Sequence, residues 1–154
     1  MSRPNPTYTL EEIQKEPDRD FPRFVRDDAT RLGEITVGII LEWGVNLCVD
    51  VHIGDELAYR AQLGTTGQFN ADVIRRKILT VNKFGHSSLL ARLKRDADPG
   101  FGSELPEEYV VAGGSIPIFV DGVMTATISA SGEEDALDHE VIAEALDRFA
   151  AERN

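Results

Sequence analysis

The stretch "SIPIFVDGVMTATISASG" (residues 115–132) holds the clearest structural signal in this chain of 154 residues. Apolar and polar residues alternate on both sides of Asp121-Gly122. An Asp-Gly pair between two alternating runs is the strongest short-range signal for a β-hairpin, because its backbone adopts the turn that matches the twist of the strands. The stretch therefore predicts two antiparallel strands joined by a tight turn.

A second hairpin is predicted earlier in the chain, over residues 47–63. Its first strand alternates apolar side chains with Cys48, Asp50 and His52, and its second strand follows Gly54-Asp55. Such alternation is typical of a strand with one buried face. His52 lies on the polar face of this pattern, so we expect its side chain to be exposed.

Helical spacing of apolar residues surrounds the two hairpins. It predicts helices over residues 23–43, 69–84, from about 86–88 onward, and about 133–152. Gly44 and Gly85 end two of them, and Ser131 with Glu134 forms a capping-box pattern for the last. Two hairpins separated by helices favour an α+β fold, in which an antiparallel sheet is flanked by helices. A fifth strand has no clear place in this pattern.

The first 22 residues differ from the rest because they hold four of the seven prolines together with many charges. We expect an N-terminal arm over residues 1–22, with one short helical turn where Thr9 and Glu12 form a capping-box pattern. Residues 23–154 have the length of a single domain. The arm is either a loose tail or a segment that wraps a neighbouring subunit.

Charge and composition narrow the classes of function. With a net charge of −11, the protein is expected to repel nucleic-acid phosphates and anionic membrane surfaces. The longest apolar run, "ITVGIIL", is too short to span a membrane, and the first residues lack the apolar core of a signal peptide. The single cysteine, Cys48, excludes an intramolecular disulfide and suits a reducing compartment. We therefore expect a cytoplasmic protein that binds neither nucleic acid nor membrane.

Positive charge gathers in one segment of this acidic chain. Residues 69–95 contain seven cations and one acid, whereas residues 133–153 contain eight acids and two arginines. One interpretation is that the basic and acidic segments meet, within the fold or between subunits. The other is an anion site, because the planar fork of arginine suits carboxylate or phosphate.

Three kinds of group contribute to the candidate anion site: neighbouring cations, a histidine and serine at a helix start, and a glycine pair. Its residues are Arg75, Arg76, Lys77, His86, Ser87, Gly113 and Gly114. The free backbone N–H groups of a helix start attract anions. Paired glycines allow a tight backbone path whose N–H groups can cradle an oxyanion. No set of residues has the spacing of a structural zinc site.

Three segments together resemble the haem-degrading domain family, which includes glycolate-operon and haem-binding proteins. They are "LGTTGQFNADVIRRKILTVNKFGHSS", "GGSIPIFVDGV" and "ISASGEEDALDHEVIAEAL", and the match is closest to an uncharacterised branch of the family. The resemblance covers roughly residues 44–149. It implies an α+β fold with an antiparallel sheet of about five strands, flanking helices and assembly into homo-oligomers. The matching residues are Arg75, Arg76, Lys77, Phe84, Gly85, His86, Ser87, Ser88, Gly113, Gly114, Pro117, Ser131, Gly132, Asp138 and His139.

The resemblance also raises haem as a ligand. Haem iron needs an axial ligand such as histidine. His86 is the best candidate because its cationic neighbours suit the haem propionates. His139, in the first turns of the acidic helix, is expected to be solvated or at a subunit contact.

Two functional hypotheses follow from the sequence. In the first, an oligomeric member of the family binds a small anionic ligand in a basic pocket, either haem through its propionates or a small carboxylate. If this protein is an enzyme, His86 is the candidate ligand or general base. In the alternative, the protein is an assembly module whose basic segment docks on the acidic last helix of another subunit.

Overall fold

The computed structural model describes residues 3–153 as five helices and five strands. In chain order they are α1 (Leu10–Gln14), β1 (Arg19–Phe21), α2 (Arg26–Trp43), β2 (Cys48–Ile53), β3 (Glu56–Gln62), α3 (Gln68–Phe84), α4 (Ser88–Ala97), β4 (Ser115–Val120), β5 (Val123–Ser131) and α5 (Asp135–Glu152). Both predicted hairpins are present, β2 with β3 and β4 with β5. Gly44 and Gly85 end α2 and α3 in the left-handed conformation, as predicted.

The strands form one sheet in the order β1-β4-β5-β2-β3. All neighbouring strands are antiparallel except β1, which pairs parallel with β4. The prediction of a purely antiparallel sheet is therefore wrong at this edge. The fifth strand is β1, a three-residue segment of the N-terminal arm. It is too short to show alternation, and its pairing partner lies about a hundred residues away.

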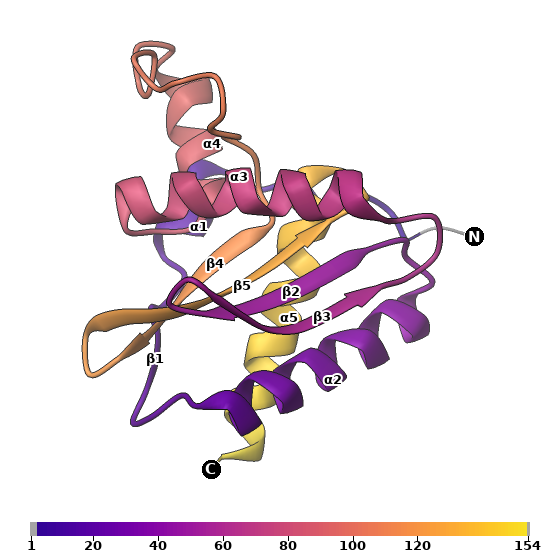
Figure 1. The fold of residues 1–154 in the computed structure, drawn as a ribbon. Helices are drawn as coiled ribbons and strands as arrows, with labels where there is room; N and C mark the ends of the chain where they lie inside the picture. Colours follow the sequence, from indigo (N-terminus) through magenta and orange to yellow (C-terminus); the bar gives the residue numbers. More distant parts are fainter. Residues whose placement is uncertain (1–2, 154) are drawn as a thin grey trace.

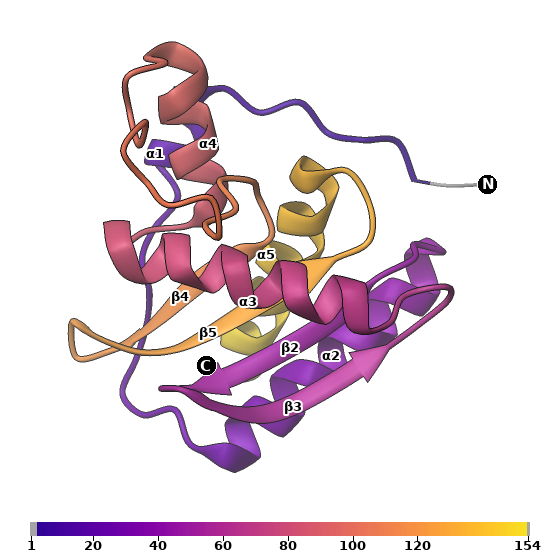
Figure 2. The same cartoon turned by 45° about the horizontal axis from the view of Figure 1, so that its top comes forward.

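The two faces of the sheet are covered differently (Figure 1). Helices α2 and α5 pack on one face over the main hydrophobic core, and α3 crosses the other (Figure 2). Because side chains alternate along a strand, one residue in two points towards α3. These residues are mostly polar, and several are buried: Asp50, Ser115, Thr127, Ser129 and Ser131. The side of the sheet beneath α3 is thus a buried polar layer.

The arm packs on its own chain. Ile13 of α1 is buried against Leu89 and Leu93 of α4, and the predicted capping box of Thr9 and Glu12 is present. The division into an arm over residues 1–22 and a domain over residues 23–154 stays a prediction. Within residues 3–153, no helix combines the length and apolar composition needed to cross a membrane.

The predicted capping box at the start of the last helix is wrong. Helix α5 begins at Asp135 with Glu134 as its N-cap residue, and no side chain caps it. The Ser131 hydroxyl instead accepts a hydrogen bond from Asn70 of α3, at 3.4 Å. Ser131 is the last residue of β5, and its side chain belongs to the polar layer beneath α3.

Candidate functional site

The three neighbouring cations of the candidate site point in different directions. Arg75 is exposed on α3 and pairs with Asp72 one turn earlier. Arg76 donates hydrogen bonds to two backbone carbonyls, those of Glu107 and Glu108. Lys77 turns into the protein interior, with only 3% of its side chain exposed. The structure therefore does not bring the three charges together in one pocket.

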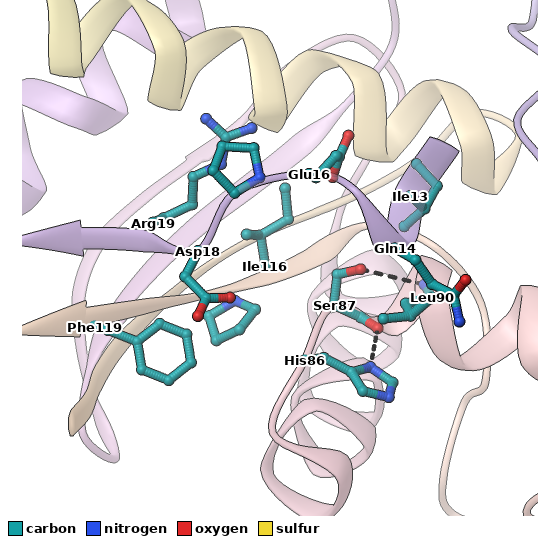
Figure 3. A pocket seen from close by; sticks show the side chains of 12 residues that line it. Ile13, Gln14, Glu16, Asp18, Arg19, His86, Ser87, Leu90, Ile116 and Phe119 are labelled. Carbon is teal, nitrogen blue, oxygen red and sulfur yellow. Dashed lines mark hydrogen bonds between the residues drawn. The ribbon is translucent and has the colours of Figure 1, made fainter. Parts of the chain in front are cut away.

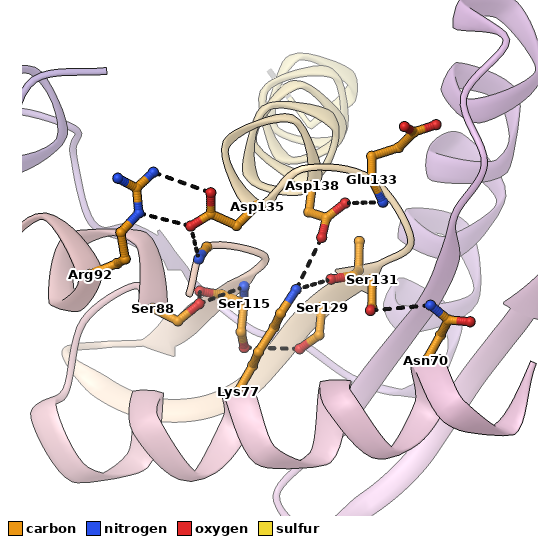
Figure 4. A network of polar contacts seen from close by, with 12 residues as sticks. Asn70, Lys77, Ser88, Arg92, Ser115, Ser129, Ser131, Glu133, Asp135 and Asp138 are labelled. Atoms are coloured by element: carbon orange, nitrogen blue, oxygen red, sulfur yellow. Dashed lines mark hydrogen bonds and ion pairs between the residues drawn. The ribbon is translucent and has the colours of Figure 1, made fainter. Parts of the chain in front are cut away.

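Lys77 reaches a buried carboxylate at the start of α5 (Figure 4). Its ammonium donates to a carboxylate oxygen of Asp138 at 3.1 Å and to the carbonyl of Ala130 at 2.9 Å. The other carboxylate oxygen of Asp138 accepts the backbone N–H of Glu133. Burial raises the pKa of Asp138 to about 7, and the nearby Lys77 only partly opposes this effect. This pair joins α3 to α5 and leaves little of Lys77 for a ligand.

The glycine pair is required by close packing around the same group. A Cβ atom on Gly114 would lie 2.6 Å from both the Ala130 carbonyl oxygen and the Lys77 ammonium, and Gly114 has a φ of 122°. The N–H of Gly113 donates to the Asp135 carboxylate at 2.9 Å. That carboxylate also accepts two hydrogen bonds from Arg92. The Gly113 N–H is thus already bonded within the chain.

The basic and acidic segments meet inside the fold at two ion pairs, Asp135–Arg92 and Asp138–Lys77, as one interpretation of the sequence predicted. The other four carboxylates of α5 pair with cations from outside the basic segment. Each of the six carboxylates of α5 has a cationic partner in the same chain. The pairs are Asp135–Arg92, Asp138–Lys77, Glu140–Arg3, Glu144–Arg148, Asp147–Arg19 and Glu152–Arg31. The charge pattern of the sequence predicted the two segments. It did not predict the ion pair of Arg92 with Asp135, which forms because α4 and α5 lie side by side.

His86 has a defined protonation state and orientation. It follows the end of α3 and lies just before α4, whose N-cap is Ser87. Its Nδ1 lies 2.9 Å from the Ser87 carbonyl oxygen, which can only accept, so Nδ1 carries the proton. Its Nε2 lies 3.1 Å from the Lys94 ammonium, which can only donate, so Nε2 holds the lone pair. Burial lowers the pKa of His86, the hydrogen bond to the Ser87 carbonyl partly opposes this effect, and the charge of Lys94 adds to it. The net lowering favours the neutral form of the ring.

A recess of about 100 Å³ opens beside His86 and Ser87 (Figure 3). Six of its twelve lining residues are apolar, two are the acids Glu16 and Asp18, and part of the arm forms the facing wall. The lining residues are Ile13, Gln14, Glu16, Pro17, Asp18, Arg19, His86, Ser87, Leu90, Ile116, Pro117 and Phe119. Sequence reasoning missed the contribution of the arm to this recess, because no local motif marks it. Lys94 contacts His86 but is not among the residues that line the recess.

The other two histidines differ from what the sequence suggested. His139 is fully buried rather than solvated, and its Nε2 lies 3.0 Å from the Glu16 carboxylate of the arm. His52 is half-buried rather than exposed, and its Nδ1 has no hydrogen-bond partner among the described residues. Over residues 3–153, no three histidine, cysteine or carboxylate side chains gather as metal ligands would.

Comparison with protein families gives one match over most of the chain. Residues 24–147 match the family described as haem degrading protein HbpS-like. A UPF0303 protein of Streptomyces coelicolor, SCO2848, is 30% identical to this chain, and the alignment covers 99% of this chain and all of that protein.

Solved structures share the fold. The crystal structure of the Ybr137w protein superposes with a TM-score of 0.83 at 24% identity, covering 94% of this chain and 88% of that one. The crystal structure of a PduOC–haem complex superposes with a TM-score of 0.67 at 16% identity, covering 80% of this chain and 93% of that one. At these identities the likeness concerns the fold alone.

Proposed function

This chain belongs to the family of HbpS-like haem-degrading proteins, and on that premise we propose that it binds a carboxylate-bearing ligand at the recess beside His86. The ligand is haem, held through its iron and propionates, or a small carboxylate. The observation that carries the proposal is the state of His86. Its neutral form is favoured, its Nδ1–H is fixed by a backbone carbonyl, and its lone pair points to one cation, Lys94.

This arrangement has the features of a metal-binding histidine. Such histidines donate the second ring N–H to a backbone carbonyl or a carboxylate, which fixes the tautomer and strengthens the ligating nitrogen. Ser87 supplies that carbonyl here. When an anionic ligand arrives, the ammonium of Lys94 leaves Nε2 and pairs with a carboxylate. Haem, when bound, would supply a redox-active iron, and Nε2 of His86 would hold that iron.

Space decides how much of such a ligand one chain can enclose. Pockets that bury a drug-sized ligand measure roughly 300–1,000 Å³, whereas the recess measures about 100 Å³. A small carboxylate fits within it. Only one edge of a haem ring fits, so the rest of the ring lies outside the recess of a single chain. The nitrogen donor of His86 therefore suits haem better than the volume of the recess does.

Haemin titration of the purified protein, followed by absorbance in the Soret region, tests the haem form of the proposal. We expect a saturable shifted band in the wild type, its loss in His86→Ala and its retention in His52→Ala. His52 is a matched control because it lies on β2, outside the residues that line the recess.

A band that is absent, or that is equal in the wild type and in His86→Ala, would remove haem from this site. The small-carboxylate form is then tested by titrating acetate and succinate while recording amide NMR signals. Saturable shifts at residues 86–90, lost in His86→Ala, support it. Without such shifts for either ligand class, the proposed site is wrong.

A further inference from the structure

We propose that a second binding site, at the far end of α5, takes an amphiphilic carboxylate, a molecule with an apolar body and one carboxylate head. A groove of about 420 Å³ lies there, lined by Asp20, Phe21, Pro22, Arg23, Ala150 and Arg153. Its volume falls within the range of roughly 300–1,000 Å³ typical of small-molecule pockets. The C-terminal end of α5 lies beside the chain that leads from β1 into α2 (Figure 1).

The floor of the groove is apolar and already formed. Phe21, Pro22 and Ala150 supply its apolar surface. The Phe21 ring meets Phe149 edge-on, with 5.3 Å between ring centroids, and also contacts Phe24 at 6.3 Å. Because these rings belong to the main core, the floor needs no rearrangement to receive an apolar ligand body.

The rim of the groove offers donors rather than acceptors. Asp20 is the only acid among the lining residues, and both of its carboxylate oxygens already accept backbone N–H groups, from Asp121 and Gly122. Arg153 donates one N–H to Asp28 and lies over the Phe149 ring, 4.0 Å from its centroid. A guanidinium has five N–H donors, so others remain.

Arg23 gives the groove a positive charge that can receive a carboxylate. It is exposed and forms no ion pair with any residue between 3 and 153, although the chain carries a net charge of −11. The fork of an arginine matches a carboxylate in shape and charge. An apolar floor below two arginines therefore fits an apolar body with a carboxylate head.

Amide NMR titrations with hexanoate and with 1-hexanol as probes test this site, because the two share an apolar chain and differ in charge. We expect saturable hexanoate shifts confined to residues 20–24 and 149–153, and weaker binding of hexanol. Arg23→Gln should weaken hexanoate about fivefold, as expected for one partly exposed charge pair, and leave hexanol unchanged. Ala150→Leu, which fills the floor, should weaken both probes.

Lys83→Gln is the matched control, because it removes one exposed positive charge from α3, on the opposite face of the sheet. The proposal is overturned if hexanoate gives no saturable shifts in this region, or if hexanol binds as tightly. It is also overturned if Arg23→Gln behaves like the wild type or Lys83→Gln weakens hexanoate equally. Shifts only at residues 86–90 would contradict this site and support the His86 recess, so the two proposals can fail independently.

Discussion

Asp138 carries a carboxylate into the protein interior, where 2% of its side chain is exposed and Lys77 is its partner. Burying two charges is costly, and the mutual attraction of an ion pair repays that cost only with good geometry and further hydrogen bonds. Here the Ala130 carbonyl and the Glu133 N–H supply such bonds. The pair is therefore a structural joint between α3 and α5, although in sequence Lys77 looked like one of three surface cations.

The raised pKa of Asp138 predicts how stability depends on pH. The pKa rises from 3.8 to about 7 on folding, so the folded state binds this proton more tightly than the unfolded state. The contribution of this proton to the stability of the folded state is fully present below about pH 4 and is lost as the pH rises through 7. We expect the unfolding free energy of the wild type, relative to Asp138→Asn, to fall as the pH rises between those values.

Urea unfolding of both proteins at a series of pH values measures this difference, since the asparagine variant lacks the titrating group. A difference that stays constant, or grows with pH, would show that the pKa of Asp138 is not raised.

The loop between α4 and β4 explains why cations gather on α3 and α4. Arg76 bonds the carbonyls of Glu107 and Glu108, and Arg95 bonds that of Val111. Thr80 adds a hydrogen bond to the Val110 carbonyl. Part of the basic segment therefore fastens a long loop to the helices.

Arg76→Gln should loosen this loop, because a neutral side chain cannot replace two charge-assisted hydrogen bonds. We expect faster amide hydrogen exchange over residues 101–111, by about tenfold, with little change in the sheet. Mass spectrometry of peptic fragments resolves the two regions. Equal exchange in Arg76→Gln and wild type would mean that the loop is held by its other contacts. Arg75→Gln is the control, because it removes one positive charge without removing a bond to the loop.

The sequence predicted the helices and strands whose ends are marked by neighbouring residues. It did not predict structure that depends on contacts with distant residues. The Asp121-Gly122 turn and the ends of α2 and α3 follow from the conformation of a few neighbouring residues. Strand β1 exists because residues 19–21 reach the edge of β4, which no local pattern encodes. His139 is buried for the same reason, since Tyr8 and Glu16 of the arm cover it.

Over the whole molecule, opposite charges are segregated along the sequence, and those of α5 are paired in the fold. Sequence analysis located His86 and Ser87 correctly at a helix start. It did not show that Lys77 is buried away from His86 and Ser87. The face of α3 that is buried depends on the polar layer of the sheet, which no local pattern reveals. All carboxylates of α5 are paired within the chain, so a neighbouring subunit would have to break those pairs to use them.

The double variant Arg75→Gln/Arg76→Gln tests the assembly alternative. We expect the molar mass measured by light scattering to equal that of the wild type, because α5 has no unpaired carboxylate to receive these arginines. A lower mass in the variant, with the fold retained by circular dichroism, would support the assembly module in place of the ligand site.

The most direct test of the proposed site is the protonation of His86, read from the ring ¹⁵N signals of histidine-labelled protein at pH 7. The structure predicts a proton on Nδ1 and a lone pair on Nε2. His139, whose Nε2 lies 3.0 Å from the Glu16 carboxylate, should carry a proton on Nε2 in the same spectrum. A doubly protonated His86, or one with its proton on Nε2, would mean that no lone pair is available there, and would contradict the His86 site.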